Sequence, residues 1–176
     1  MKKSAKQILL LFVAIILGGI STQVVYAQTG AQIGMADQQK RQVRAAALKK
    51  LNEVGQQRCA DSEYAAYYEK SPCSAAKVTP EQLEDQTKIT PAQKAVLVKV
   101  KQSISVTYQE RLRIDKEYGG DNEIKFAEYV ESNMKPRVDK NDLNLYDGKI
   151  TWGQYNKERN AMLLEAEEER KKIYQK

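Results

Sequence analysis

One short pattern occurs three times in the sequence and limits what the chain can fold into. A β-branched residue is followed by Thr, two further residues and Gln in VTPEQL (78–83), ITPAQK (89–94) and ITWGQY (150–155). In such a stretch the Thr side chain can accept from the amide of the Gln, and the Gln side chain can accept from the amide of the Thr. This reciprocal pair is the capping box of a helix start. The pattern therefore predicts three helix starts, rather than a sequence repeat or a binding code.

Apolar periodicity between these starts predicts an all-α fold. A first helix is expected from about Ala36 to Gln57, because apolar residues follow one stripe of it. The longest helix is expected to begin at Pro91 and to end at Gly119, with the glycine in the C′ position. The alternation that marks strands is absent. We expect a small irregular bundle of about four to six helices.

The second half of the chain predicts two further helices. Asp121 is expected to cap one that ends before Pro136, and an irregular stretch then leads to the helix opened by Thr151. This long C-terminal helix becomes mostly charged over about 160–176. Its end is expected either to be solvated or to project and pair with a second copy of the chain.

The N-terminus has the three parts of a secretory signal peptide. Lysines at positions 2, 3 and 6 precede an apolar run of thirteen residues at 8–20, and a V-Y-A segment allows cleavage between Ala27 and Gln28. The apolar run is shorter than the roughly 20 residues that a membrane span needs. We therefore expect 1–27 to be removed, 28–176 to fold as a single domain, and the protein to be periplasmic or secreted in a bacterium. Removal lowers the formal net charge from +6 to +3. Export makes nucleic acid a poor partner, and a basic surface alone does not change this.

The two cysteines, Cys59 and Cys73, are expected to form a structural disulfide. Cysteines in an oxidising compartment usually pair. Their spacing is not the C-x-x-C of a redox dithiol, and the chain has no histidine to complete a zinc site. Closing a loop of this length stabilises the fold by roughly 3 kcal/mol.

Three tyrosines inside the disulfide loop lie at helical spacing, after a cap expected at Asp61. Tyr64, Tyr67 and Tyr68 share one face of a short helix. They either pack in the core or form an aromatic patch for a partner, because Tyr is enriched at interfaces. The core interpretation is favoured, because a small domain needs its large apolar groups for packing.

The sequence from Asp147 resembles part of a calcium-binding loop but lacks its ligands. In the DGKITWGQY stretch the first and third positions of such a loop are Leu143 and Leu145, and the twelfth is Gln154. Calcium needs oxygen ligands at these positions, with a bidentate Glu at the twelfth. A turn that feeds a capped helix is the expected structure, and no metal or cofactor is predicted.

The residue inventory disfavours catalysis. Without histidine the commonest general base is missing, and paired cysteines leave no thiol nucleophile. We expect no enzyme but a small exported protein that binds a protein of the cell envelope, as an inhibitor, immunity factor or adaptor. The alternatives are a periplasmic holdase-like chaperone or scaffold and, second, a carboxylate-dependent envelope glycosidase. The candidate contact residues for the first hypothesis are Tyr64, Tyr67, Tyr68, Trp152 and Tyr155.

Overall fold

The computed structural model describes residues 34–175 of the chain. The chain divides into two units, 1–42 and 43–176. In the first unit the described residues, 34–42, are helical and exposed. In the second unit residues 43–60 are also helical. Every residue of the predicted helix from Ala36 to Gln57 is therefore helical. The predicted leader and its cleavage site between Ala27 and Gln28 lie outside the described residues.

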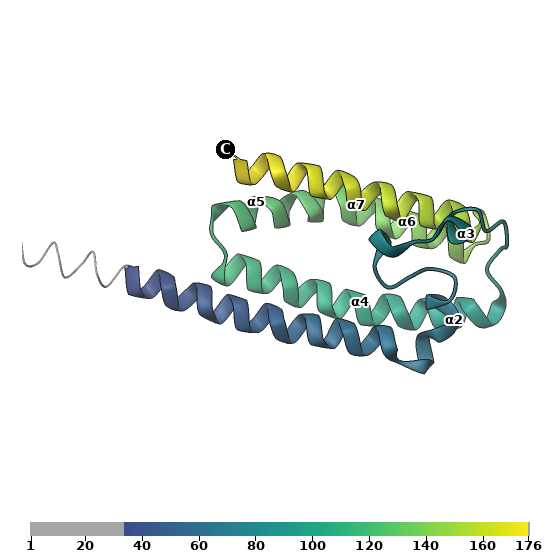
Figure 1. The fold of residues 1–176 in the computed structure, drawn as a ribbon, viewed down its shortest axis with the longest axis horizontal. Coiled ribbons are helices and arrows are strands. Elements are labelled where there is room, and N and C mark those ends of the chain that lie inside the picture. The colour runs from purple at the N-terminus through teal and green to yellow at the C-terminus, as the bar shows by residue number, and fades with distance from the viewer. Residues whose placement is uncertain (1–33, 176) are drawn as a thin grey trace, which may run out of the picture. The chain divides into compact units, whose positions relative to one another are not determined.

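Helices account for all the regular structure in the described part of the chain, so the predicted all-α bundle is confirmed. The 43–60 helix, α4, the broken helix of α5 and α6, and α7 run along the second unit, and the short helical elements between 60 and 91 lie at one end of it (Figure 1). After 43–60 the elements are η1 (Ser62–Tyr64), α2 (Ala65–Tyr68), η2 (Ala75–Lys77), α3 (Pro80–Leu83), α4 (Pro91–Tyr118), α5 (Asp121–Tyr129), the π turn η3 (Val130–Met134), α6 (Lys135–Tyr146) and α7 (Trp152–Gln175).

All three predicted capping boxes are present. The amide of each Gln donates to the Thr Oγ1 at 3.2–3.3 Å, and the amide of each Thr donates to the Gln Oε1 at 2.9–3.1 Å. Each cap satisfies two amides that a helix start leaves without intrahelical partners. The caps belong to α3, α4 and α7, and their pairs are Thr79 with Gln82, Thr90 with Gln93, and Thr151 with Gln154.

The helix predicted to end before Pro136 does not end there. Helical backbone continues from α5 through η3 into α6, and residues 135–146, expected to be irregular, are helical. The amide of Lys135 donates to the carbonyl of Val130, five residues back, which is the wide hydrogen bond of a π turn. A proline removes a donor and crowds the preceding turn. Pro136 is accommodated because it lies in the first turn of α6, directly after this wider turn.

The junction between α4 and α5 differs from the prediction in two details. Gly119 has an extended conformation, with φ −79° and ψ 161°, instead of the left-handed one expected. Glycine fits here because an added Cβ would lie 2.2 Å from the carbonyl oxygen of Asp115 and 2.7 Å from Cβ of Glu123. The N-cap of α5 is Gly120, whose amide donates to Glu123 Oε2 at 3.0 Å. Asp121 is the first helical residue, where a negative charge is favourable.

Large aromatic side chains fill the end of the bundle where α2, the start of α4 and the start of α7 meet. The Tyr67 ring lies edge-on to Trp152 and to Tyr155, with centroid separations of 5.8 and 6.4 Å. Edge-to-face pairs of this kind add to the stabilisation from burial alone. We call this cluster the aromatic core; its buried members are Tyr67, Ile89, Leu97, Val100, Leu145, Trp152 and Tyr155.

The loop after α3 packs directly on the first turn of α7. The amide of Trp152 donates to the carbonyl of Thr87 at 3.1 Å, and that of Gly153 donates to the carbonyl of Asp85 at 2.8 Å. A Cβ on Gly153 would lie 2.5 Å from the carbonyl oxygen of Leu83. Glycine at this position therefore lets the loop approach closely enough to use the free amides of the helix start.

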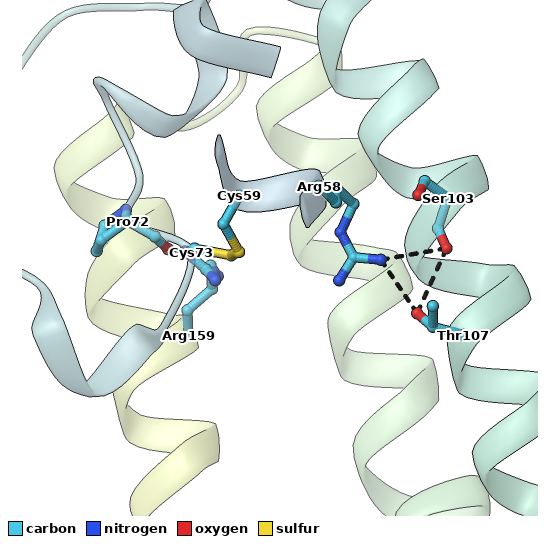
Figure 2. Close-up of a disulfide and its surroundings, with 7 residues drawn as sticks. All are labelled: Arg58, Cys59, Pro72, Cys73, Ser103, Thr107 and Arg159. Atoms are coloured by element: carbon cyan, nitrogen blue, oxygen red, sulfur yellow. Dashed lines mark hydrogen bonds between the residues drawn. A yellow bond between two sulfur atoms is a disulfide. The ribbon is translucent and has the colours of Figure 1, made fainter. Parts of the chain in front are cut away.

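The predicted Cys59–Cys73 disulfide is formed, with Cα atoms 5.7 Å apart. It joins the end of the 43–60 helix to the loop that carries α2 (Figure 2). Beside it, Arg58 Nη1 donates to Thr107 Oγ1 at 3.2 Å on α4. On the other side, Arg159 Nη1 donates to the carbonyl of Pro72 at 3.1 Å on α7 (Figure 2). The bridge is thus held between α4 and α7, where it fixes the loop that brings Tyr67 into the aromatic core.

Candidate functional site

Most of the predicted contact residues lie in the core. Tyr67, Trp152 and Tyr155 are no more than 2% exposed, and Tyr64 and Tyr68 are partly buried against the same cluster. A side chain inside the core cannot meet a partner, so the hypothesis of an aromatic docking patch is corrected for the three buried residues. The physical reason is the one that favoured the core interpretation: a domain of this size needs its largest apolar groups for packing.

A chain of polar groups extends from the aromatic core into the bundle. The hydroxyls of Tyr67 and Tyr155 are 2.8 Å apart, and Tyr155 donates to Asp142 Oδ1 at 2.8 Å. Asp142 also forms an ion pair with Lys101 of α4. Burial, together with the nearby Tyr67 and Asp142, raises the pKa of Tyr155 well above its ordinary value. Tyr155 therefore stays a neutral donor to the Asp142 carboxylate.

Next to this polar chain a cavity of about 290 Å³ lies between α4, η3, α6 and α7. We call it the central cavity. Its polar end is formed by Tyr155, Asp142 and Arg159, and its apolar walls include Ile104 and Met134. Small-molecule sites commonly have this composition, with mostly apolar walls and a few convergent polar groups.

A second cavity of about 250 Å³, here the side cavity, adjoins the central one between α4 and α6. The shared walls show that the two cavities are adjacent. Tyr108 lines the side cavity, and its hydroxyl is buried without a hydrogen-bond partner. Burial raises the pKa of this hydroxyl, so it stays protonated. The lining residues common to both cavities are Lys101, Ile104, Val130, Met134 and Val138.

Arg159 is the most unusual group at the central cavity. Its Nη1 donates to Ser71 Oγ and to the carbonyl of Pro72, and its guanidinium lies 5.7 Å from the centre of the Tyr155 ring. All of these partners are neutral. Among the described residues no ion pair includes Arg159. Burial alone lowers the pKa of Arg159, but the nearby Tyr67, Tyr155 and Asp142 together outweigh it, so the pKa is raised and the side chain is cationic.

A separate apolar surface lies at the edge between α4 and α6. Val98, Leu143 and Tyr146 are 41%, 56% and 41% exposed. Lys94 Nζ lies 5.1 Å from the centre of the Tyr146 ring, and the ion pair between Lys101 and Asp142 joins the same two helices. Val98 lies between Lys94 and Lys101 along α4, and Leu143 and Tyr146 lie in the turn of α6 that follows Asp142. We call these three apolar residues the α4–α6 edge.

The stretch that resembles a calcium loop forms a turn and a capped helix. Gly148 has φ +70°, the left-handed conformation that glycine tolerates best, and its amide donates to the carbonyl of Leu145 at 2.8 Å. Thr151 then caps α7 as described. Within residues 34–175, no three His, Cys, Asp or Glu side chains are grouped as ligands of a metal ion.

Of the groups that line the central cavity, the sequence analysis named only Tyr67 and Tyr155, as contact residues for a partner; it did not find the other lining groups or the α4–α6 edge. Leu143 and Tyr146 fall in the stretch predicted to be irregular, because Pro136 predicts a helix end. Arg159 had a detectable signal, since it lies four residues after Tyr155 on the apolar seam of α7, where a charged side chain is out of place.

Comparison with protein-family models, with curated proteins and with solved structures gave no match. Among the helices that the structure describes, none combines the length and the hydrophobicity of a membrane span. The function is therefore inferred from the site itself.

Proposed function

We propose that this protein is a small exported bacterial protein that acts by binding another protein of the cell envelope, as an inhibitor, immunity factor or adaptor, without catalysing a reaction. The Cys59–Cys73 disulfide supports export, because such bridges persist in oxidising compartments. The three-part N-terminal sequence supports the same conclusion.

The observation that carries the proposal is the α4–α6 edge. It offers three large apolar side chains beside a lysine, on two helices that are held together by an ion pair. Apolar and aromatic groups at the centre of a surface patch, with charges around them, are typical of protein interfaces. The contact surface proposed here thus replaces the buried aromatic residues.

The buried carboxylates argue against the glycosidase alternative. Asp115, near the end of α4, accepts hydrogen bonds from Arg44 and Arg111 at 2.7 and 2.6 Å. Asp142, on α6, forms an ion pair with Lys101 of α4. A glycosidase needs two carboxyl groups that converge on one cleft. Asp115 is instead paired with two arginines and Asp142 with one lysine, at separate places in the bundle.

Site-specific photocross-linking in the periplasm tests the proposal. A photoreactive amino acid at Leu143 is expected to capture one dominant envelope protein, and Tyr146→Glu is expected to abolish the capture. The matched control is the same amino acid at Val54, which is also exposed but lies on the 43–60 helix. Equal capture at both positions would contradict the proposal, and a broad set of captured proteins would favour the holdase alternative.

A further inference from the structure

The central cavity contains a cation that has no carboxylate partner. Arg159 makes its hydrogen bonds through Nη1 alone, whereas Nε and Nη2 make none and are not fully buried, so both can still donate. A partly buried charge is costly unless a counter-charge accompanies it. The charged groups at this cavity are Lys101, Asp142 and Arg159, and the ion pair between the first two leaves one positive charge.

The walls beyond Arg159 suit an aliphatic chain. The central cavity has the volume of about ten water molecules in the liquid, and the side cavity continues it along α4 and α6. Ile104, Met134 and Val138 line both cavities. Methionine is unbranched and polarizable, so it adapts to a flexible apolar ligand.

We propose that the two cavities bind a single-chain fatty carboxylate, with the carboxylate on Arg159 and the chain between Ile104 and Met134. A guanidinium has a planar fork of donors that matches the two oxygens of a carboxylate, which favours this head group over a phosphate. The ligand supplies the missing counter-charge and fills space that the side chains leave open. This inference is independent of the proposed partner protein, because the α4–α6 edge lines neither cavity.

Calorimetric titration of the disulfide-intact exported protein with dodecanoate, below its micelle concentration, tests the proposal. We expect one dodecanoate per chain. Dodecyl maltoside, which has the same chain and a neutral head, should bind at least tenfold more weakly, and acetate or inorganic phosphate should not bind detectably. Equal binding of the carboxylate and the maltoside, or no binding of dodecanoate, would overturn the proposal.

Single substitutions test where the carboxylate of dodecanoate binds. Arg159→Gln keeps a hydrogen-bond donor but removes the charge, and we expect it to weaken dodecanoate binding at least tenfold. Its matched control is Lys157→Gln, which removes an exposed charge from α7 outside the cavities and should leave binding unchanged. Unchanged binding in folded Arg159→Gln would overturn the proposal. If Tyr108→Phe lost dodecanoate binding and Arg159→Gln kept it, the carboxylate would lie in the side cavity, and the proposal would also be overturned.

A second substitution keeps the test decisive if Arg159→Gln does not fold. Val138→Trp is expected to fill the space that the chain would occupy, to keep the helical circular dichroism spectrum, and to abolish dodecanoate binding. Retained binding in this variant would contradict the proposal. Leu143→Lys, which disrupts the α4–α6 edge, should leave dodecanoate binding intact, so failure of the partner-protein proposal can be distinguished from failure of this one.

Discussion

The aromatic core and the central cavity are both formed by α4 and α7, yet they are packed differently. In the aromatic core, the rings of Tyr67, Trp152 and Tyr155 meet edge to face, and the Trp152 side chain is fully buried. At the central cavity the same helices present longer, flexible or smaller side chains, among them Met162 and Ala166. Rigid planar groups fill one region completely, whereas the other retains an open volume of ligand size.

The two regions are packed differently because different segments of the chain supply their side chains. Tyr67 comes from the disulfide loop and is held by short elements that cross the end of the bundle. The central cavity lies further along α4 and is lined mainly by η3, α6 and α7, with Tyr67 of α2 at its boundary. We conclude that stability is concentrated in the aromatic core and that the central cavity is the region where a ligand can be accommodated.

The largest expected effect comes from emptying the aromatic core. Trp152→Ala should lower the free energy of unfolding by about 3 to 5 kcal/mol, because it removes a fully buried ring and leaves a cavity behind. Urea denaturation followed by circular dichroism measures this loss. Leu164→Ala on the exposed face of α7 is the control and should change stability by less than about 0.5 kcal/mol. Similar losses in both variants would remove the distinction between the two regions.

Removal of the disulfide should be the next largest perturbation. Replacement of Cys59 and Cys73 by Ala is expected to cost about 3 kcal/mol, since the bridge closes a loop with a sequence separation of 14. Hydrogen exchange should increase more in α2, which carries Tyr67, than in α6, which borders the central cavity. A uniform increase across both helices would show that the loop does not specifically support the aromatic core.

Replacement of Val by Ile should change the free energy of unfolding in opposite directions in the two regions. Val100→Ile in the fully packed aromatic core is expected to destabilise the protein by about 1 to 3 kcal/mol, through overpacking. Val138→Ile, at the wall of both cavities, is expected to stabilise it by about 0.5 kcal/mol, because the added methyl group fills open space. Chemical denaturation of the two variants side by side measures both changes. Destabilisation of comparable size in both would indicate that the cavity closes in solution.

An effect smaller than that of the disulfide concerns the pH dependence of the loop that covers the start of α7. Burial alone would raise the pKa of Asp85, but hydrogen bonds from Thr87 and Lys70 outweigh it, so the pKa lies below its ordinary value. Because the folded pKa is lower than the unfolded one, this contribution is fully present above about pH 4 and is lost as the pH falls through the folded pKa.

Asp85→Asn should therefore cost about 1 kcal/mol at pH 7 and less in acid. Thermal unfolding between pH 2.5 and 7 measures the difference between the variant and the wild-type protein. A constant difference over this range would show that the Asp85 carboxylate contributes no pH-dependent stability.

Much of the local structure could be predicted from the sequence. The capping boxes at Thr79, Thr90 and Thr151 involve groups only three residues apart, so their geometry is decided within one helical turn. The pairing of Cys59 with Cys73 followed from the count of two. The prediction at Pro136 was wrong because the effect of a proline depends on the turn before it, and a π turn has no clear sequence signal.

The candidate sites could not be predicted from the sequence. Leu143 and Tyr146 became a surface only when α6 formed and lay beside α4, and Arg159 came to line a cavity through contacts with the loop at Ser71 and Pro72. Residues that meet in these sites are separated by tens of positions, so no periodicity within one helix relates them.

The sequence by itself determined where helices begin, that the cysteines pair and that the fold is all-α, because caps and apolar periodicity act over a few neighbouring residues. The tertiary structure alone decided which tyrosines are buried, where packing leaves a cavity and that Arg159 lines this cavity without an ion pair. These outcomes depend on how side chains from distant segments fill a shared volume, and that volume exists only after the helices have packed.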